Sequence, residues 1–268
     1  IYVNADVQGS GSGNVNLVAG WDGTTGTGDP FDMAAVFANP TSYGIGGGSV
    51  QIGDGAQTVG IAVGSSAGAT RLAAYDLWLR GTNGTSHGYA QLGYHGPATG
   101  PTAAKLHNNL VAQAGSADYS NVQLGHGGCG VDGDYAGAID VDAANLLLEG
   151  GDGYYAYAQM GHGDAISVAI GTRQGALHIS ITGETSLVSG SGTDAVWWIG
   201  HRTATAGGIS NAPLTLLSGT LDYSDTATVT RFDISGSGGD HFAYNMTQNL
   251  AGGEGTLHAT HTTPGTAG

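Results

Sequence analysis

Three histidines that follow glycines are the first residues in this sequence whose type and spacing could support chemistry. His126, His162 and His201 recur at intervals of 36 and 39 residues, His95 lies one place later in its unit, and Asp54 takes this place in the first. Zinc needs three or four ligands at about 2.0–2.3 Å from the ion, whereas equivalent residues of stacked strands are about 4.8 Å apart. We therefore expect one stacked row whose rings bond to a neighbouring turn or face solvent, with a metal ladder as the alternative.

Four aspartates that lie close together in the sequence form a second candidate site. They are Asp132, Asp134, Asp140 and Asp142. Carboxylates at this density could hold Ca²⁺, but the spacing matches neither an EF-hand loop nor nine-residue calcium-binding repeats. Two carboxylates could also serve as general acid and base on a glycosidic bond, although no basic residue lies nearby in the sequence. The sequence favours a solvated acidic loop without a cofactor, and Ca²⁺ is the alternative.

Composition and motifs exclude several classes of function. The chain shows no nucleophile elbow, P-loop, dinucleotide-binding fingerprint or Cys-X-X-Cys pair, so we do not expect an enzyme. Six basic residues stand against 21 acidic ones, a net charge of -15 that repels nucleic acid. The sequence contains no run of about 18 apolar residues, so we expect no membrane insertion. The single cysteine, Cys129, allows no internal disulfide, and the lysine-poor surface predicts an extracellular protein.

Behind these candidate sites lies a repeat that must position them. Five units share the pattern of an aromatic residue or valine, glutamine, an aliphatic residue and glycine. Their marker residues are Gln51 and Gly53, Gln91 and Gly93, Gln123 and Gly125, Gln159 and Gly161, and Trp198 and Gly200. The glycines are 40, 32, 36 and 39 residues apart. We expect the glutamines to stack as a ladder whose amides satisfy one another.

A second, leucine-rich element precedes most of these units and also ends in glycine. Examples are the segments 77–81, 110–115 and 146–150. Short aliphatic runs closed by glycine read as strands with tight corners, and a fixed repeat of such strands winds into a parallel β-helix. Each unit of about 36 residues would hold one large coil or two smaller ones. The best helical candidates, Thr102–Val111 and Pro30–Phe37, are interpreted as loop excursions.

The repeats predict one solenoid over residues 1–230 and a segment, 231–268, that departs from the pattern. We expect this last segment to be a cap or a contact between subunits. The pair Trp197 and Trp198, where tryptophan replaces the glutamine, is interpreted as a cap on the core, with an exposed contact patch as the alternative.

The segment Asn14–Gly23, together with units such as Tyr157–Gly163, resembles the filamentous haemagglutinin-like adhesins over about residues 1–220. The resemblance implies a right-handed parallel β-helix, export by two-partner secretion, and adhesion or fibre formation at a bacterial cell surface. It transfers no catalytic residues.

These observations together predict an extracellular structural or adhesive β-solenoid rather than an enzyme. Solenoid ends present unpaired strands, so we expect self-association end to end into a filament, with surface or glycan ligands as further partners. The alternative is a carbohydrate-active β-helix enzyme of the polysaccharide lyase or depolymerase type, with the four aspartates in its groove.

Overall fold

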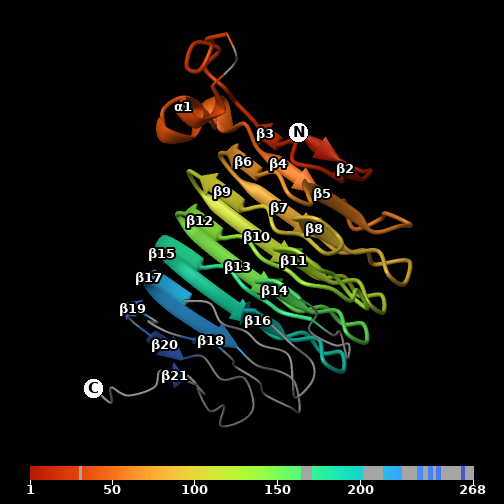
Figure 1. Ribbon diagram of the computed structural model, residues 1–268. Coiled ribbons are helices and arrows are strands. Elements are labelled where there is room, and N and C mark those ends of the chain that lie inside the picture. The colour runs from red at the N-terminus through yellow and green to blue at the C-terminus, as the bar shows by residue number, and fades with distance from the viewer. Residues whose placement is uncertain are drawn as a thin grey trace.

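The chain winds into a parallel β-solenoid in which each coil adds one strand to each of three faces (Figure 1). The computed structural model describes residues 1–29, 32–163 and 171–201, and beyond them the strands β17–β21. Every strand pair is parallel. The predicted parallel solenoid is therefore confirmed.

We call the three faces A, B and C, in the order in which each coil visits them. Face A consists of β1 (Tyr2–Val3), β4 (Val50–Ile52), β7 (Leu77–Arg80), β10 (Asn109–Gln113) and β13 (Asn145–Glu149). Face B consists of β2 (Val7–Gly9), β5 (Ile61–Ser65), β8 (Ala90–Leu92), β11 (Val122–Leu124), β14 (Ala158–Met160) and β16 (Trp197–Gly200). Face C consists of β3 (Val15–Val18), β6 (Thr70–Ala74), β9 (Thr102–Leu106) and β12 (Ile139–Ala143).

The long strand β15 (Leu177–Val188) joins faces C and A, because its first half pairs with β12 and its second half with β13. The connection from face C to face A shortens along the chain to this point. It contains Tyr75 and Asp76 after β6, His107 and Asn108 after β9, and Ala144 alone after β12.

Strand register gives the length of a coil. Leu77 pairs with Leu110, Leu110 with Leu146, and Leu146 with Thr185, so successive coils contain 33, 36 and 39 residues. Each repeat unit is therefore one coil rather than two smaller ones. The coils differ in length in their corner loops, because the paired strands keep the same register from coil to coil.

The core fills the space enclosed by the three faces. Burial alternates along the strands, as in β12 and β13, where every second side chain points inward. On face C the inward row of Leu72, Ala104, Val141 and Ile179 is fully buried. Like residues thus stack on like through successive coils, which is how a repeat too small to bury its own apolar side buries it against its neighbours.

The two helical candidates have different outcomes. Residues 102–111 form the core strands β9 and β10, so the interpretation of this segment as a helix or a loop excursion is wrong. The other candidate, Pro30–Phe37, overlaps the helix α1 (Met33–Ala38), whose N-terminus is capped by the Asp32 carboxylate. With the 3-10 turn η1 (Ile45–Gly47), α1 belongs to an excursion between β3 and β4. Across the described part of the chain, no helix is long and apolar enough to cross a membrane.

The register corrects the first repeat unit. Ala62 and Val63 of β5 pair with Gln91 and Leu92 of β8, which sets Gly64 opposite Gly93. Gln51 instead lies on face A, where it pairs with Trp78, and Gly53 follows on that face. The assignment of Gln51 and Gly53 to the glutamine and glycine rows is therefore wrong, because a short apolar run ending in glycine occurs on more than one face.

The described strands beyond residue 200 continue the same ladders. They are β17 (Leu214–Ser224), β18 (Ile234–Ser237), β19 (His241–Ala243), β20 (Met246–Gln248) and β21 (His261–Thr262). Strand β18 pairs with β16, and β19 and β20 pair with β17. Solenoid pairing thus extends past residue 230, and a role for 231–268 as a cap or subunit contact stays a prediction.

Candidate functional site

The histidines predicted to stack do form one row, and it lies inside the protein. His126, His162 and His201 each follow a face-B strand, and all three are buried. The ring centroids of His126 and His162 are 4.9 Å apart and the angle between the ring planes is 1°. For His162 and His201 the distance is 4.6 Å and the angle 4°. The spacing is that of stacked strands, as expected.

Backbone contacts fix the protonation state of this row. The main-chain N–H groups of Tyr94, His126 and His162 donate to Nδ1 of the histidine one coil further on, at 3.0, 2.9 and 3.0 Å. Each Nε2 lies 2.6–2.8 Å from a glycine carbonyl. An amide can only donate and a carbonyl can only accept, so each ring is neutral with its proton on Nε2.

Electrostatics agree with neutral rings. Burial lowers the pKa of His126 and of His201. It lowers the pKa of His162 well below the usual value, and repulsion from the other two histidines adds to the effect. With Nδ1 and Nε2 both committed to backbone groups, the row has no nitrogen left for a metal ion. It is a structural ladder, and His95, which stacks on Tyr89, and Asp54 lie outside it.

The glutamines also stack, but they bond to backbone rather than to one another. Gln91, Gln123 and Gln159 occupy one row of face B and are buried. Nε2 of Gln91 donates to the Gly125 carbonyl at 2.7 Å, and Nε2 of Gln123 donates to the Gly161 carbonyl at 3.0 Å. The prediction that the amides satisfy one another is therefore wrong.

The glycines explain this bonding, because Gly125 and Gly161 have φ of +139° and +149°. That backbone geometry is available to glycine and not to other residues. The carbonyl groups of these two glycines are the ones that accept the amides of Gln91 and Gln123 from the preceding coil.

Trp198 continues the glutamine row and, with Trp197, is buried. Because β16 pairs on both sides, with β14 and β18, the two tryptophans are neither a cap at the end of the core nor an exposed patch.

On the outside of face C, three coils bring charged side chains together. Lys105 Nζ on β9 lies 2.6 Å from Oδ2 of Asp140 and also contacts Oδ2 of Asp142, both on β12. Nδ1 of His178 on β15 lies 3.1 Å from Oδ1 of Asp140. Partial burial lowers the pKa of Lys105, but its hydrogen bonds to the two carboxylates outweigh this and the pKa is raised.

The four aspartates that were predicted to form one acidic loop do not all lie together. Asp140 and Asp142 lie on a strand, while Asp134 accepts hydrogen bonds from the backbone and hydroxyl of Thr172. Among the described residues, only Asp140, Asp142 and His178 place three metal-ligating groups within 4.8 Å of one another. The Lys105 ammonium already pairs with both carboxylates and occupies the position that a cation would take, so the residues present do not favour Ca²⁺. Lys105 and His178 were missed because stacking, not sequence proximity, brings them here.

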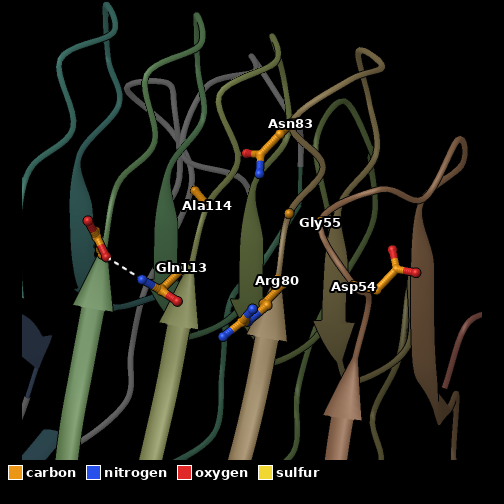
Figure 2. Close-up of a pocket in the computed structure, with 8 residues that line it drawn as sticks. Asp54, Gly55, Arg80, Asn83, Gln113 and Ala114 are labelled. Atoms are coloured by element: carbon orange, nitrogen blue, oxygen red, sulfur yellow. Dashed lines mark hydrogen bonds between the residues drawn. The ribbon is translucent and has the colours of Figure 1, made fainter. Parts of the chain in front are cut away.

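A groove lies at the corner where the chain passes from face A to face B (Figure 2). One part of about 200 Å³ is lined by Asp54, Gly55, Arg80, Gly81, Asn83, Gln113, Ala114 and Glu149. A second part of about 200 Å³ shares Asn83, Ala114 and Glu149 and continues to Asp152, Ser189 and Ser191. The shared residues join the two parts into one groove, which we call the corner groove.

Two rows of polar side chains border the corner groove. Arg80, Gln113 and Glu149 end three neighbouring strands in register, and Nε2 of Gln113 donates to Glu149 at 2.7 Å, the dashed line in Figure 2. The loops that follow contribute the second row of Asn83, Ser116, Asp152 and Ser191, in which the Ser191 hydroxyl donates to Asp152 at 2.6 Å.

Small residues line the groove between these two rows, among them Ala114, Gly115 and Gly151. Gly115 and Gly151 come so close to the preceding coil that a Cβ would lie within 2 Å of the carbonyl oxygens of Thr82 and Gly115, respectively. Aligning the leucine-rich elements by their leucines would have placed Arg80, Gln113 and Glu149 in one row, but not the groove beside them.

No protein-family model, curated protein or solved structure matches this chain. The resemblance to the filamentous haemagglutinin-like adhesins therefore stays a prediction.

Proposed function

We propose that this chain is an extracellular structural and adhesive solenoid that lengthens by stacking end to end on further copies of itself, as the subunit of a bacterial surface filament. The observation that carries the proposal is that, among the described strands, those of the first coil pair on one side only; we call their other side the open edge. Strands β1 and β3 end the sheet that contains faces A and C, and β2 ends face B. Within the described ranges, no segment pairs with the outer edges of these three strands.

Apolar side chains accompany this open edge. Ile1 is 49% exposed, Tyr2 77% and Val7 42%. An edge strand with free N–H and C=O groups is a template for another chain, and proteins that avoid such pairing protect the edge with lysine, proline or a covering segment. The helix α1 packs instead against Val18 and Ala73, on the flank of the first two coils.

Parallel pairing makes the opposite end complementary in direction. Among the described strands, β20 and β21 are the last on faces A and B, and they run parallel to their neighbours. A second copy could therefore continue every ladder in the same sense, without turning over, which is a head-to-tail contact that propagates rather than closes. The lysine-poor, acidic composition supports an extracellular location.

Charge on the open edge tests this proposal. We expect the double variant Tyr2→Lys and Val7→Lys to remain folded, because both side chains are exposed, but to form few or no filaments, since lysines on neighbouring edges repel an incoming coil. Electron microscopy and sedimentation velocity measure the outcome. Val59→Lys, at a residue 62% exposed in a corner loop, is the matched control and should assemble like the unaltered chain. Equal assembly of the double variant would contradict the proposal.

A carbohydrate-active enzyme is the second candidate, favoured by one observation: Lys105, Asp140, Asp142 and His178 meet on the outside of face C. Two carboxylates beside a general acid or base are the groups that glycoside cleavage uses. The ion pairs of Lys105 with both aspartates argue for a structural role instead. Release of new sugar ends from a polysaccharide, lost in Asp142→Asn, would favour the enzyme over the filament.

A further inference from the structure

We propose that the corner groove binds a linear, uncharged polysaccharide along the solenoid axis. The inference rests on the proposed adhesive function and names the class of ligand for it. The groove belongs to no other site described above, and its lining side chains come from successive coils at equivalent positions.

The dimensions of the groove favour an extended, repetitive ligand. Its lining begins at Asp54 in the second coil and reaches Ser191 in the sixth. Four steps of about 4.8 Å give a length of roughly 19 Å. One step is close to the advance of one pyranose ring in an extended chain, so that successive sugars would meet successive coils. A ligand with a repeat of its own can therefore use the same contact several times.

The chemistry of the borders suits sugar hydroxyls. The guanidinium of Arg80 and the amides of Asn83 and Gln113 present planar groups of hydrogen-bonding atoms, and the serine hydroxyls of the loop row both donate and accept. Arg80, Asn83 and Asp152 are exposed. Asn83 Oδ1 already accepts from the Ser116 backbone, and Asp152 Oδ1 accepts from Ser191. This leaves the Arg80 guanidinium, Asn83 Nδ2 and Asp152 Oδ2 to meet a ligand. The small residues Ala114 and Gly150 between the two rows leave room for a flat ring.

An apolar row lies on the same face beside the polar one. Trp78, Val111 and Leu147 are half-buried and in register, two residues before Arg80, Gln113 and Glu149. Sugar rings carry C–H groups on their faces, and tryptophan offers the widest aromatic surface on which they pack. Polar atoms in the groove and an indole at its side are the two kinds of contact that a neutral sugar needs.

Charge decides which polysaccharide fits. The groove contains the carboxylates of Asp54, Glu149 and Asp152 against the single guanidinium of Arg80. The whole chain carries a net charge of -15. Both would repel uronic acid polymers and sulfated glycans, and a like-charge approach to an acidic surface is unfavourable. Charge therefore excludes an acidic ligand, and the amides and hydroxyls of the borders favour an uncharged polymer over a basic one.

The test uses the full chain with soluble neutral β-glucan, xylan and mannan, with polygalacturonate as the acidic polymer and oligolysine as the basic probe. Tryptophan fluorescence and isothermal titration calorimetry report binding. We expect at least one neutral polymer to bind and polygalacturonate not to. The double variant Asn83→Ala and Gln113→Ala should bind about tenfold more weakly, a loss of about 1.4 kcal/mol shared by the hydrogen bonds of the two side chains.

Thr99→Ala, at an exposed residue of another corner, is the matched control and should bind like the unaltered chain. Unchanged affinity in the double variant, binding of oligolysine alone, or no binding of any neutral polymer would overturn the inference. The groove variants leave the edge of the first coil intact, so their filaments should look normal. If no neutral polymer binds but filaments form normally, only this inference is wrong. If the edge double variant assembles like the unaltered chain, the proposed function is wrong.

Discussion

The buried imidazoles convert pH into stability at the scale of single residues. His126, His162 and His201 accept a backbone N–H at Nδ1, so a proton added there removes a hydrogen bond between coils. Their folded-state pKa values are lowered by burial, whereas an unfolded histidine titrates near about 6.5. The unfolded chain therefore binds protons first as the pH falls.

We expect the free energy of unfolding to be nearly constant above about pH 6.5 and to fall below it, by up to about 1.4 kcal/mol per pH unit for each histidine in the row. Urea denaturation followed between pH 8 and pH 5 measures this slope. His162→Asn should make the slope shallower, while His87→Asn, at an exposed histidine, should leave it unchanged. A flat profile down to pH 5 would show that the rings are not held neutral.

At the scale of elements, close approach of neighbouring coils depends on the glycines that follow the face-B strands β8, β11 and β14, namely Gly93, Gly125 and Gly161. Gly161 has φ of +149°, and a Cβ there would lie 1.8 Å from the carbonyl oxygen of Gly200. Because the obstacle is backbone, it cannot move aside without breaking the ladder. The glycine thus permits both the turn and the contact between coils.

Gly161→Ala should therefore destabilise the chain by at least about 3 kcal/mol, beyond the usual cost of a single strained residue. Thermal and urea unfolding followed by circular dichroism measure the change. Gly84→Ala is the control, since nothing lies within 4 Å of its added Cβ, and it should change stability by less than about 1 kcal/mol. Similar effects of the two substitutions would refute the role assigned to Gly161.

The elements also show what the sequence can and cannot predict. Rows of Gln91, Gln123 and Gln159 were predictable because each occurs once per coil in a recognisable context. The segment 102–111 misled because Thr102, Leu106 and Leu110 repeat every fourth residue, as on a helix, while Thr102, Ala104 and Leu106 also alternate as in a strand. Stacking on the neighbouring coils decided between the two periods.

The candidate sites were less predictable than the fold for a related reason. Lys105 and Asp142 are 37 residues apart, and they meet because one coil sets them side by side. Such a contact depends on the register and on the length of every corner, and the corners vary. The sequence marks the inward rows by their apolar residues, but outward rows carry no comparable pattern.

At the scale of the whole molecule, each coil contacts only its neighbours, so stability should vary along the axis. Central coils are paired on both sides, while among the described strands those of the first coil are paired on one side, and β1 and β2 are short. A stack of this kind opens from its ends with less free energy than it unfolds from its middle.

Hydrogen exchange of the unassembled chain should therefore show the strongest protection in β10–β14 and the weakest in β1–β3. We expect protection of β1–β3 to rise when filaments form, because a second copy would then cover the open edge. Uniform protection along the described coils would mean that they unfold as one unit and would contradict this gradient. Equal exchange of β1–β3 before and after assembly would place the subunit contact elsewhere.

Tension along the axis acts directly on these ladders, because the hydrogen bonds between coils run parallel to it. We call the hydrogen bonds between one coil and the next a joint. A pulling force is shared by the three faces of one joint, while successive joints along the axis each carry the whole force. The joint between β10–β12 and the next coil contains five paired positions on face A and three on face B, whereas that between the first two coils contains two and three on these faces. A stretched fibre of such subunits would yield first where its short strands meet.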